Sequence, residues 1–192
     1  KYFRFIKIYT DGSVLDSGLT GAAFVIPELN IQKSFHLGKK YSIFTAELVA
    51  ILMALNEVAS MPVNFCGIVL CVDSKSVLQA LNSNTAMARE EIIYEIKHTI
   101  HSLLSKDIQV HFCWIPSHSG LLYNDKVDRL AKVGARNISP DVHRITLQIS
   151  IKETYSLVPN FFRKRFFSAG LERKNLPKYQ DNRVVWPIDY HS

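Results

Sequence analysis

The apolar run at positions 65–72 constrains the fold of this chain more than any other feature. It is bounded by Asn64 and Asp73 and shows no alternation of polar and apolar side chains. A segment this short and this uniformly apolar is typical of a strand that is buried on both faces. Such a strand belongs to a sheet that helices cover on either side. The run therefore predicts an α/β fold.

Three further strands are expected before this run. Residues 3–10 alternate and are rich in aromatic and β-branched side chains, and they end at Asp11, where an Asp-Gly-Ser sequence is typical of a turn. Residues 20–26 and 31–37 are also strand-like, and a four-residue connection beginning at Pro27 joins them as in a hairpin. We expect three antiparallel strands, with Asp11 at the end of the first.

From Thr45 onwards the apolar residues recur at helical spacing. Thr45 is the expected N-cap of this helix, and Pro62 lies beyond its end. These bounds place Glu47 in the first helical turn.

The remaining elements complete the pattern. They are helices at 74–81, 90–104 and 124–135 and a strand at 110–115. The order of elements predicts an α/β fold built on a mixed five-stranded sheet, with three strands antiparallel and two parallel, flanked by helices.

Three carboxylates lie at boundaries of these elements. Asp11 and Asp73 each follow a strand, and Glu47 lies on the helix between them. If the first and fourth strands are neighbours, the three side chains meet at the carboxyl edge of the sheet, where ligands bind in such folds. A fourth carboxylate, Asp128, lies one helical turn after Asn124.

Carboxylates that converge repel one another unless a cation neutralises them. Oxygen ligands without His or Cys favour Mg²⁺ or Mn²⁺ over Zn²⁺. A pair of such ions suits in-line displacement at a phosphodiester, so the expected substrate is a nucleic-acid backbone. Taken singly, each residue has another explanation: Asp11 as a turn former, Glu47 as a helix-dipole partner, Asp73 as part of a helix cap, and Asp128 as an ion-pair partner of Lys132.

Five ordered motifs carry a resemblance to a known family. They are Tyr9-Thr10-Asp11-Gly12-Ser13, Thr45-Ala46-Glu47-Leu48, Cys71-Val72-Asp73-Ser74, the segment from Trp114 to Gly120, and the segment from Asn124 to Ala131. Over about residues 3–136 the chain resembles type 1 ribonuclease H, most closely the ribonuclease H domains of non-LTR retrotransposon polyproteins.

The resemblance implies an endonuclease that cuts the RNA strand of an RNA/DNA hybrid. Its implied ligands for two Mg²⁺ ions, for which Mn²⁺ can substitute, are Asp11, Glu47, Asp73 and Asp128. The resemblance also implies that His118, on a loop, assists proton transfer or product release. A reverse transcriptase domain of the same polyprotein is the implied protein partner.

Contacts to the nucleic acid follow from the same resemblance. The backbone of Gly12 and Ser13 is expected near the RNA 2′-hydroxyl groups, which distinguish RNA from DNA. Lys40 and Ser42 match positions where cellular members hold a phosphate of the DNA strand. The full set of expected contacts is Gly12, Ser13, Lys40, Ser42, Ser74 and Asn124.

Two other functions remain open from the sequence. One is an inactive ribonuclease H-like module that binds nucleic acid or has a structural role, although such a module would be expected to lose at least one of the acidic residues. The other is a transposase or integrase, whose essential Glu should follow the second Asp. Here Glu47 precedes Asp73.

The charge distribution divides the chain. Lys and Arg outnumber Asp and Glu by 23 to 17, and most of this excess lies after residue 135. We expect a catalytic domain at 1–136 and a basic extension at 137–192 that docks on the core or connects to a further region. Within the extension, residues 160–167 interleave aromatic and basic side chains and suit either docking or contact with nucleic acid.

The cysteines and the hydropathy of the sequence indicate the state of the thiols and whether the chain associates with a membrane. Cys66, Cys71 and Cys113 lie in apolar stretches and are expected to be buried, reduced thiols. The longest uninterrupted apolar run, residues 48–55, is far shorter than the roughly 20 residues of a membrane span, so no membrane association is expected. We expect a monomeric intracellular protein, in nucleus or cytoplasm, whose sequence is part of a longer one.

Overall fold

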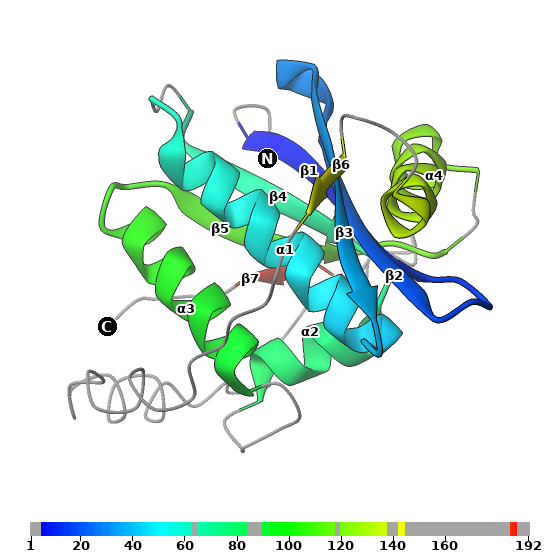
Figure 1. Ribbon diagram of the computed structural model, residues 1–192. Helices are drawn as coiled ribbons and strands as arrows, with labels where there is room; N and C mark the ends of the chain where they lie inside the picture. Colours follow the sequence, from blue (N-terminus) through cyan, green and yellow to red (C-terminus); the bar gives the residue numbers. More distant parts are fainter. Residues whose placement is uncertain are drawn as a thin grey trace.

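A mixed sheet forms the centre of the computed structural model, which describes residues 5–62, 65–83, 90–117, 120–137, 142–144 and 185–187 (Figure 1). The sheet order is β6-β3-β2-β1-β4-β5-β7. Its strands are β1 (Phe5–Val14), β2 (Leu19–Ile26), β3 (Ile31–Lys39), β4 (Gly67–Val72), β5 (Gln109–Trp114), β6 (Val142–Arg144) and β7 (Val185–Pro187). The longer strands β1 to β5 form the predicted core of three antiparallel and two parallel strands, which confirms the fold class.

Helices cover both faces of this sheet. They are α1 (Ile43–Ser60), α2 (Lys75–Asn82), α3 (Glu90–Leu104) and α4 (Leu122–Arg136), with a short 3-10 helix at Pro27–Leu29. Neighbouring residues of β2 separate the two faces: Phe24 packs in the core beneath α1 and α3, whereas Val25 packs against α4. Figure 1 shows α1 and α3 side by side across the sheet. All six residues of β4 are buried, as the apolar run predicted.

Strand β1 continues past the expected turn at Asp11. The strand extends to Val14, and Asp11 pairs with Ala23 of β2. The prediction that the strand ends at Asp11 was therefore wrong. The physical reason is that β2 supplies antiparallel backbone partners for these residues, and a Gly in a strand permits close approach of another backbone. Only the pairing with β4 ends earlier, at Tyr9 and Cys71.

Helix α1 begins earlier than its spacing predicted. Ser42, not Thr45, is the N-cap, and its Oγ accepts a hydrogen bond of 3.1 Å from the Thr45 backbone N–H. Glu47 consequently lies beyond the first turn, contrary to the sequence-based expectation. Both Ser and Thr are good N-caps, but Thr45 is fully buried inside the domain, and Ser42 is exposed at the helix start.

Three smaller differences also concern element ends and burial. Helix α4 begins at Leu122, two residues before the expected start. Cys66 is exposed rather than buried, whereas Cys71 and Cys113 are buried. Two short strands of the basic extension, β6 and β7, pair with β3 and β5. The aromatic and basic run at 160–167 lies outside the described residues.

Helix α1 is the most apolar of the described helices. By length and composition alone it could cross a membrane, with a mean hydropathy of 1.6 over 18 residues. Yet 56% of that segment is buried inside the domain, against the sheet and α3. Burial of its apolar face against the sheet gives this hydropathy a structural explanation.

Two glycines, Gly21 on β2 and Gly134 on α4, allow the backbone of helix α4 to lie directly against the sheet. A Cβ at Gly21 of β2 would collide with the backbone of Ala131 and Ala135. On the helix side, a Cβ at Gly134 would lie 2.7 Å from the Phe35 carbonyl oxygen of β3. The absence of a side chain at these two positions thus permits the close contact between α4 and the sheet.

We expect Gly21→Ala to lower the free energy of unfolding by about 3 kcal/mol, the upper part of the range for overpacking, because its new methyl group meets backbone that cannot move aside. Gly18→Ala is the matched comparison, since Gly18 has a φ of +78° but nothing within 4 Å of the added Cβ. That variant should lose only about 1 kcal/mol, from backbone strain. Urea unfolding measures both. Equal losses would contradict the close packing of α4.

Candidate active site

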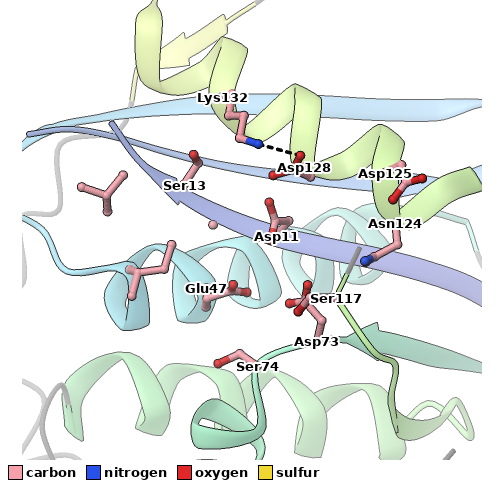
Figure 2. Close-up of a pocket in the computed structure, with 13 residues that line it drawn as sticks. Asp11, Ser13, Glu47, Asp73, Ser74, Ser117, Asn124, Asp125, Asp128 and Lys132 are labelled. Carbon is pink, nitrogen blue, oxygen red and sulfur yellow. Dashed lines mark hydrogen bonds and ion pairs between the residues drawn. The ribbon is translucent and has the colours of Figure 1, made fainter. Parts of the chain in front are cut away.

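Three carboxylates from three elements meet at one edge of the sheet. Asp11 comes from β1, Glu47 from α1, and Asp73 follows β4. Each offers an oxygen atom, and these atoms all lie within 4.8 Å of one another. Figure 2 shows the three side chains pointing toward the same space. The convergence follows from the sheet, because β1 and β4 are parallel neighbours. Their pairing with each other ends at Tyr9 and Cys71, and Asp11 and Asp73 each lie two residues further along the chain.

Gly12 determines how closely α1 approaches β1. It is buried, and a Cβ at this position would lie 2.6 Å from the Glu47 backbone nitrogen and 2.7 Å from the Ala46 Cβ. Real Cβ atoms do not make contacts this short. A glycine here therefore lets the helix backbone touch the strand and brings Glu47 toward Asp11.

Burial leaves two of these carboxylates without full hydrogen bonding. Asp11 is 7% exposed and Glu47 is 5% exposed. Asp11 Oδ2 and Glu47 Oε2 have no hydrogen-bond partner within the described part of the chain. Unpartnered buried carboxylate oxygens are costly, and a bound cation is the usual partner for such atoms.

The electrostatics of the cluster favour the protonated acids in the absence of a cation. Burial raises the pKa of Asp11 to about 8, with further contributions from the charges of Asp73 and Asp128. Burial also raises the pKa of Glu47 well above its ordinary value, and Asp11 and Asp73 add to the effect. Hydrogen bonds from the Gly12 backbone oppose both shifts. A site of this kind is typical of function rather than of structural stabilisation.

Asp128 lines the same pocket but lies apart from the three-carboxylate cluster. The open pocket has a volume of about 400 Å³. Asp128 Oδ2 accepts a 2.8 Å ion-pair hydrogen bond from Lys132 Nζ, one turn further along α4 (Figure 2). The sequence-based alternative of an i,i+4 partner for Asp128 is therefore present in the structure.

The expected nucleic-acid contacts are divided between the pocket and its surroundings. Four of them line the pocket: Gly12, Ser13, Ser74 and Asn124. Asn124 is 4% exposed, and its Oδ1 has no hydrogen-bond partner in the described segments. Lys40 is exposed outside the pocket, with a φ of 76°, and Ser42 caps α1. His118 lies outside the described residues.

Several pocket residues were not expected from the sequence. The pocket is also lined by Val14, Ile43, Ser117, Asp125 and Lys132. Asp125 lies in the motif that begins at Asn124 and Lys132 directly follows that motif, so helical spacing from Asp128 could have indicated both. Val14 and Ile43 carry no such signal, because single exposed apolar residues are common on protein surfaces.

Trp114 is a further residue that the sequence did not assign to the site. Its indole Nε1–H donates a 3.0 Å hydrogen bond to the Asp73 backbone carbonyl, 41 positions earlier in the chain. Lys75 Nζ lies 4.1 Å from the centroid of the Trp114 ring, a cation–π geometry. The two contacts hold the short link between β4 and α2, and that link carries Asp73.

The family assignment follows from a comparison with protein families. The model of the RNase H family matches residues 4–136, which includes all four acidic residues of the pocket named in the resemblance. The chain belongs to the RNase H family. A curated relative, "Ribonuclease H" of Blochmanniella pennsylvanica (strain BPEN), is 26% identical over 152 residues, which cover 70% of this chain and 94% of that protein.

Family membership supports ribonuclease H activity and therefore a nuclease, a class of hydrolase. The RNase H family acts on RNA/DNA hybrids and generally uses divalent metal ions. The residues present fit such an ion, because the cluster supplies only hard oxygen donors and includes two buried oxygens that lack partners.

We expect the free energy of unfolding to fall as the pH rises from about 4 to 8 in EDTA. In the unfolded chain the Asp11 carboxyl has its ordinary pKa of 3.8 and is deprotonated above that pH. In the folded protein its pKa is about 8, so it keeps its proton up to about that pH. Between these two values the folded state binds more protons than the unfolded state. The stabilising contribution of Asp11 to the free energy of unfolding is therefore complete below pH 3.8 and is lost as the pH rises to 8. The loss is at most about 1.4 kcal/mol per pH unit for one proton.

Asp11→Asn is the control for this pH dependence. It should make the slope shallower, because one of the two titrating carboxyls is gone, and Glu47 should retain the rest. Urea unfolding at several pH values measures both proteins. A variant slope as steep as that of the wild type would contradict the raised pKa of Asp11.

Trp114→Phe should weaken Mn²⁺ binding about three- to tenfold. A phenyl ring replaces the indole, so an aromatic side chain is kept, but the hydrogen bond to the Asp73 carbonyl is lost, and such a bond contributes about 0.5–1.5 kcal/mol. Titration calorimetry gives the affinity, and a thermal melt recorded alongside separates this effect from a loss of folding. Unchanged affinity would mean that Asp73 is held without Trp114.

Proposed function

We propose that this chain is a Mg²⁺-dependent endoribonuclease that hydrolyses the RNA strand of RNA/DNA hybrids. The observation that carries the proposal is the cluster of Asp11, Glu47 and Asp73, whose oxygens lie within 4.8 Å and include two that are buried without partners. Membership of the RNase H family supplies the substrate class. A binding module has no need to bury carboxylates at this cost to folding.

In this proposal the four acidic residues hold two Mg²⁺ ions. Asp11, Glu47 and Asp73 would supply the inner ligands, and Asp128 would join them from α4. The bound ions would polarise the attacking water and stabilise the leaving oxygen of the scissile phosphodiester. Mn²⁺ can take the same oxygen ligands.

The other residues of the pocket would orient the hybrid. Gly12 and Ser13 lie on β1 beside the cluster, which suits contacts to the 2′-hydroxyl groups of the RNA strand. Ser74 and Asn124 face the same pocket and offer hydroxyl and amide groups. Lys40 and Ser42, at the start of α1, suit a phosphate of the DNA strand.

His118 would exchange protons near the reaction. In the sequence His118 directly follows Ser117, which lines the pocket. An imidazole with an ordinary pKa near 6.5 can both accept and donate a proton at neutral pH. We assign to it a role in proton transfer or product release.

The biological context belongs to the same proposal. The five motifs resemble the ribonuclease H domains of non-LTR retrotransposons, so we propose that the chain functions as a monomeric module of, or derived from, a retroelement reverse transcriptase. The family match alone does not distinguish this subtype from cellular enzymes.

Cleavage of a labelled RNA strand tests the activity. We expect cutting of the RNA/DNA hybrid with Mg²⁺, but not of duplex RNA, of single-stranded RNA, or of the hybrid in EDTA. Asp73→Asn should lower the rate by at least about a hundredfold, since the loss of even an outer partner of a metal site costs about 10–100-fold.

Asp107→Asn is the matched control for Asp73→Asn. Asp107 is exposed in the turn between α3 and β5, outside the pocket, and its φ of 60° is one that Asn adopts readily. This variant should cut at the wild-type rate. If the wild type binds the hybrid but leaves it intact with Mg²⁺ and with Mn²⁺, the chain is a binding module instead.

A further inference from the structure

Among the described residues that line the pocket, Lys132 is the one with a basic side chain. Five carboxylates share that lining with it: Asp11, Glu47, Asp73, Asp125 and Asp128. Its charge reaches beyond its partner, since Lys132 lowers the pKa of Asp11 while Asp128 raises it. In the free protein Lys132 therefore supplies part of the positive charge that the pocket requires.

The ion pair between Lys132 and Asp128 is partly exposed to solvent, so its two side chains can separate. The nitrogen and oxygen are 2.8 Å apart, but the two side chains are 42% and 28% exposed. Pairs at i,i+4 on a partly solvated helix surface are weak, so a stronger competitor can separate them. The Lys stem is flexible, and its ammonium group can turn toward another anion without movement of the helix.

The backbone of α4 offers little freedom of its own. Gly21 and Gly134 bring the helix into direct backbone contact with β2 and β3. Asp128 can therefore reach an ion in the cluster mainly by rotation of its side chain. That rotation requires Asp128 to release or to share its contact with Lys132, and an ammonium group beside a divalent ion at the same carboxylate is unfavourable because the two cations repel.

We propose that Lys132 is a resident counter-ion that withholds Asp128 from a second metal ion until a phosphate of the nucleic acid draws the ammonium group away. Asp11, Glu47 and Asp73 take one ion in the free protein. Asp128 contributes to a second only when Lys132 has a phosphate to bind. This inference rests on the proposed function, because it concerns the order in which the same site is filled.

Ion binding to the free protein tests the order of filling. Calorimetric titration of the wild type with Mn²⁺ should give one ion, with any second ion much weaker. Lys132→Met keeps most of the stem but removes the charge, so the affinity for a second ion should rise at least about tenfold. Lys132→Arg keeps the charge and should restore the wild-type pattern.

Lys126→Met is the matched control, because Lys126 lies on the same helix but does not line the pocket. It should leave the titration unchanged. Hybrid binding in EDTA gives an independent readout: Lys132→Met should reduce the slope of log affinity against log salt by about one, as expected for the loss of one phosphate contact.

The outcomes separate the two proposals. If the wild type and Lys132→Met bind two ions with the same affinities, the inference is wrong and the proposed function stands. An unchanged salt slope would likewise count against it. If none of the proteins binds Mn²⁺ or Mg²⁺, both the inference and the proposed function are wrong. Because Lys132 is partly exposed, thermal melts should show that each variant folds.

Discussion

The parallel pairing of β1 with β4 is the constraint on which the site depends. Their pairing ends at Tyr9 and Cys71, and an aspartate lies two residues further along each segment: Asp11 within β1 and Asp73 just after β4. Parallel neighbours leave the sheet at the same edge, so the two carboxylates share one location without any specific contact between them. Helix α1 then adds Glu47 because Gly12 lets its backbone reach the strand. Topology and one missing side chain together set the geometry.

The clustering of carboxylates that the function requires lowers the stability of the folded chain. Clustered carboxylates on buried positions destabilise the folded chain unless a proton or a cation neutralises them, as the raised pKa values of Asp11 and Glu47 show. The opposing contribution comes from the apolar core beneath α1 and α3, where Leu48, Ile51 and Leu70 are fully buried. A large core is therefore a condition for holding such a site.

Sequence reasoning predicted most of the fold because the signals were local. The uniform apolar run ending at Val72 and the helical spacing after Thr45 depend only on neighbours in the chain. It failed at β1, which a distant segment, β2, extends past Asp11. It also misplaced the N-cap of α1, because both Ser42 and Thr45 are suitable caps and the sequence did not indicate that Thr45 is buried. The three clustered carboxylates were predicted from their positions at element ends. The hydrogen bond from Trp114 to Asp73 joins residues 41 positions apart, and no local pattern indicates it.

The two short strands β6 and β7 affect how much unpaired backbone the edges of the sheet expose to other chains. They lie outside the stretch that the family model matches, yet they pair with β3 and β5, the outer strands of the family core. An unpaired outer strand offers free N–H and C=O groups on which a foreign strand can assemble. By pairing with three residues of each outer strand, β6 and β7 leave fewer of these groups free for a foreign strand.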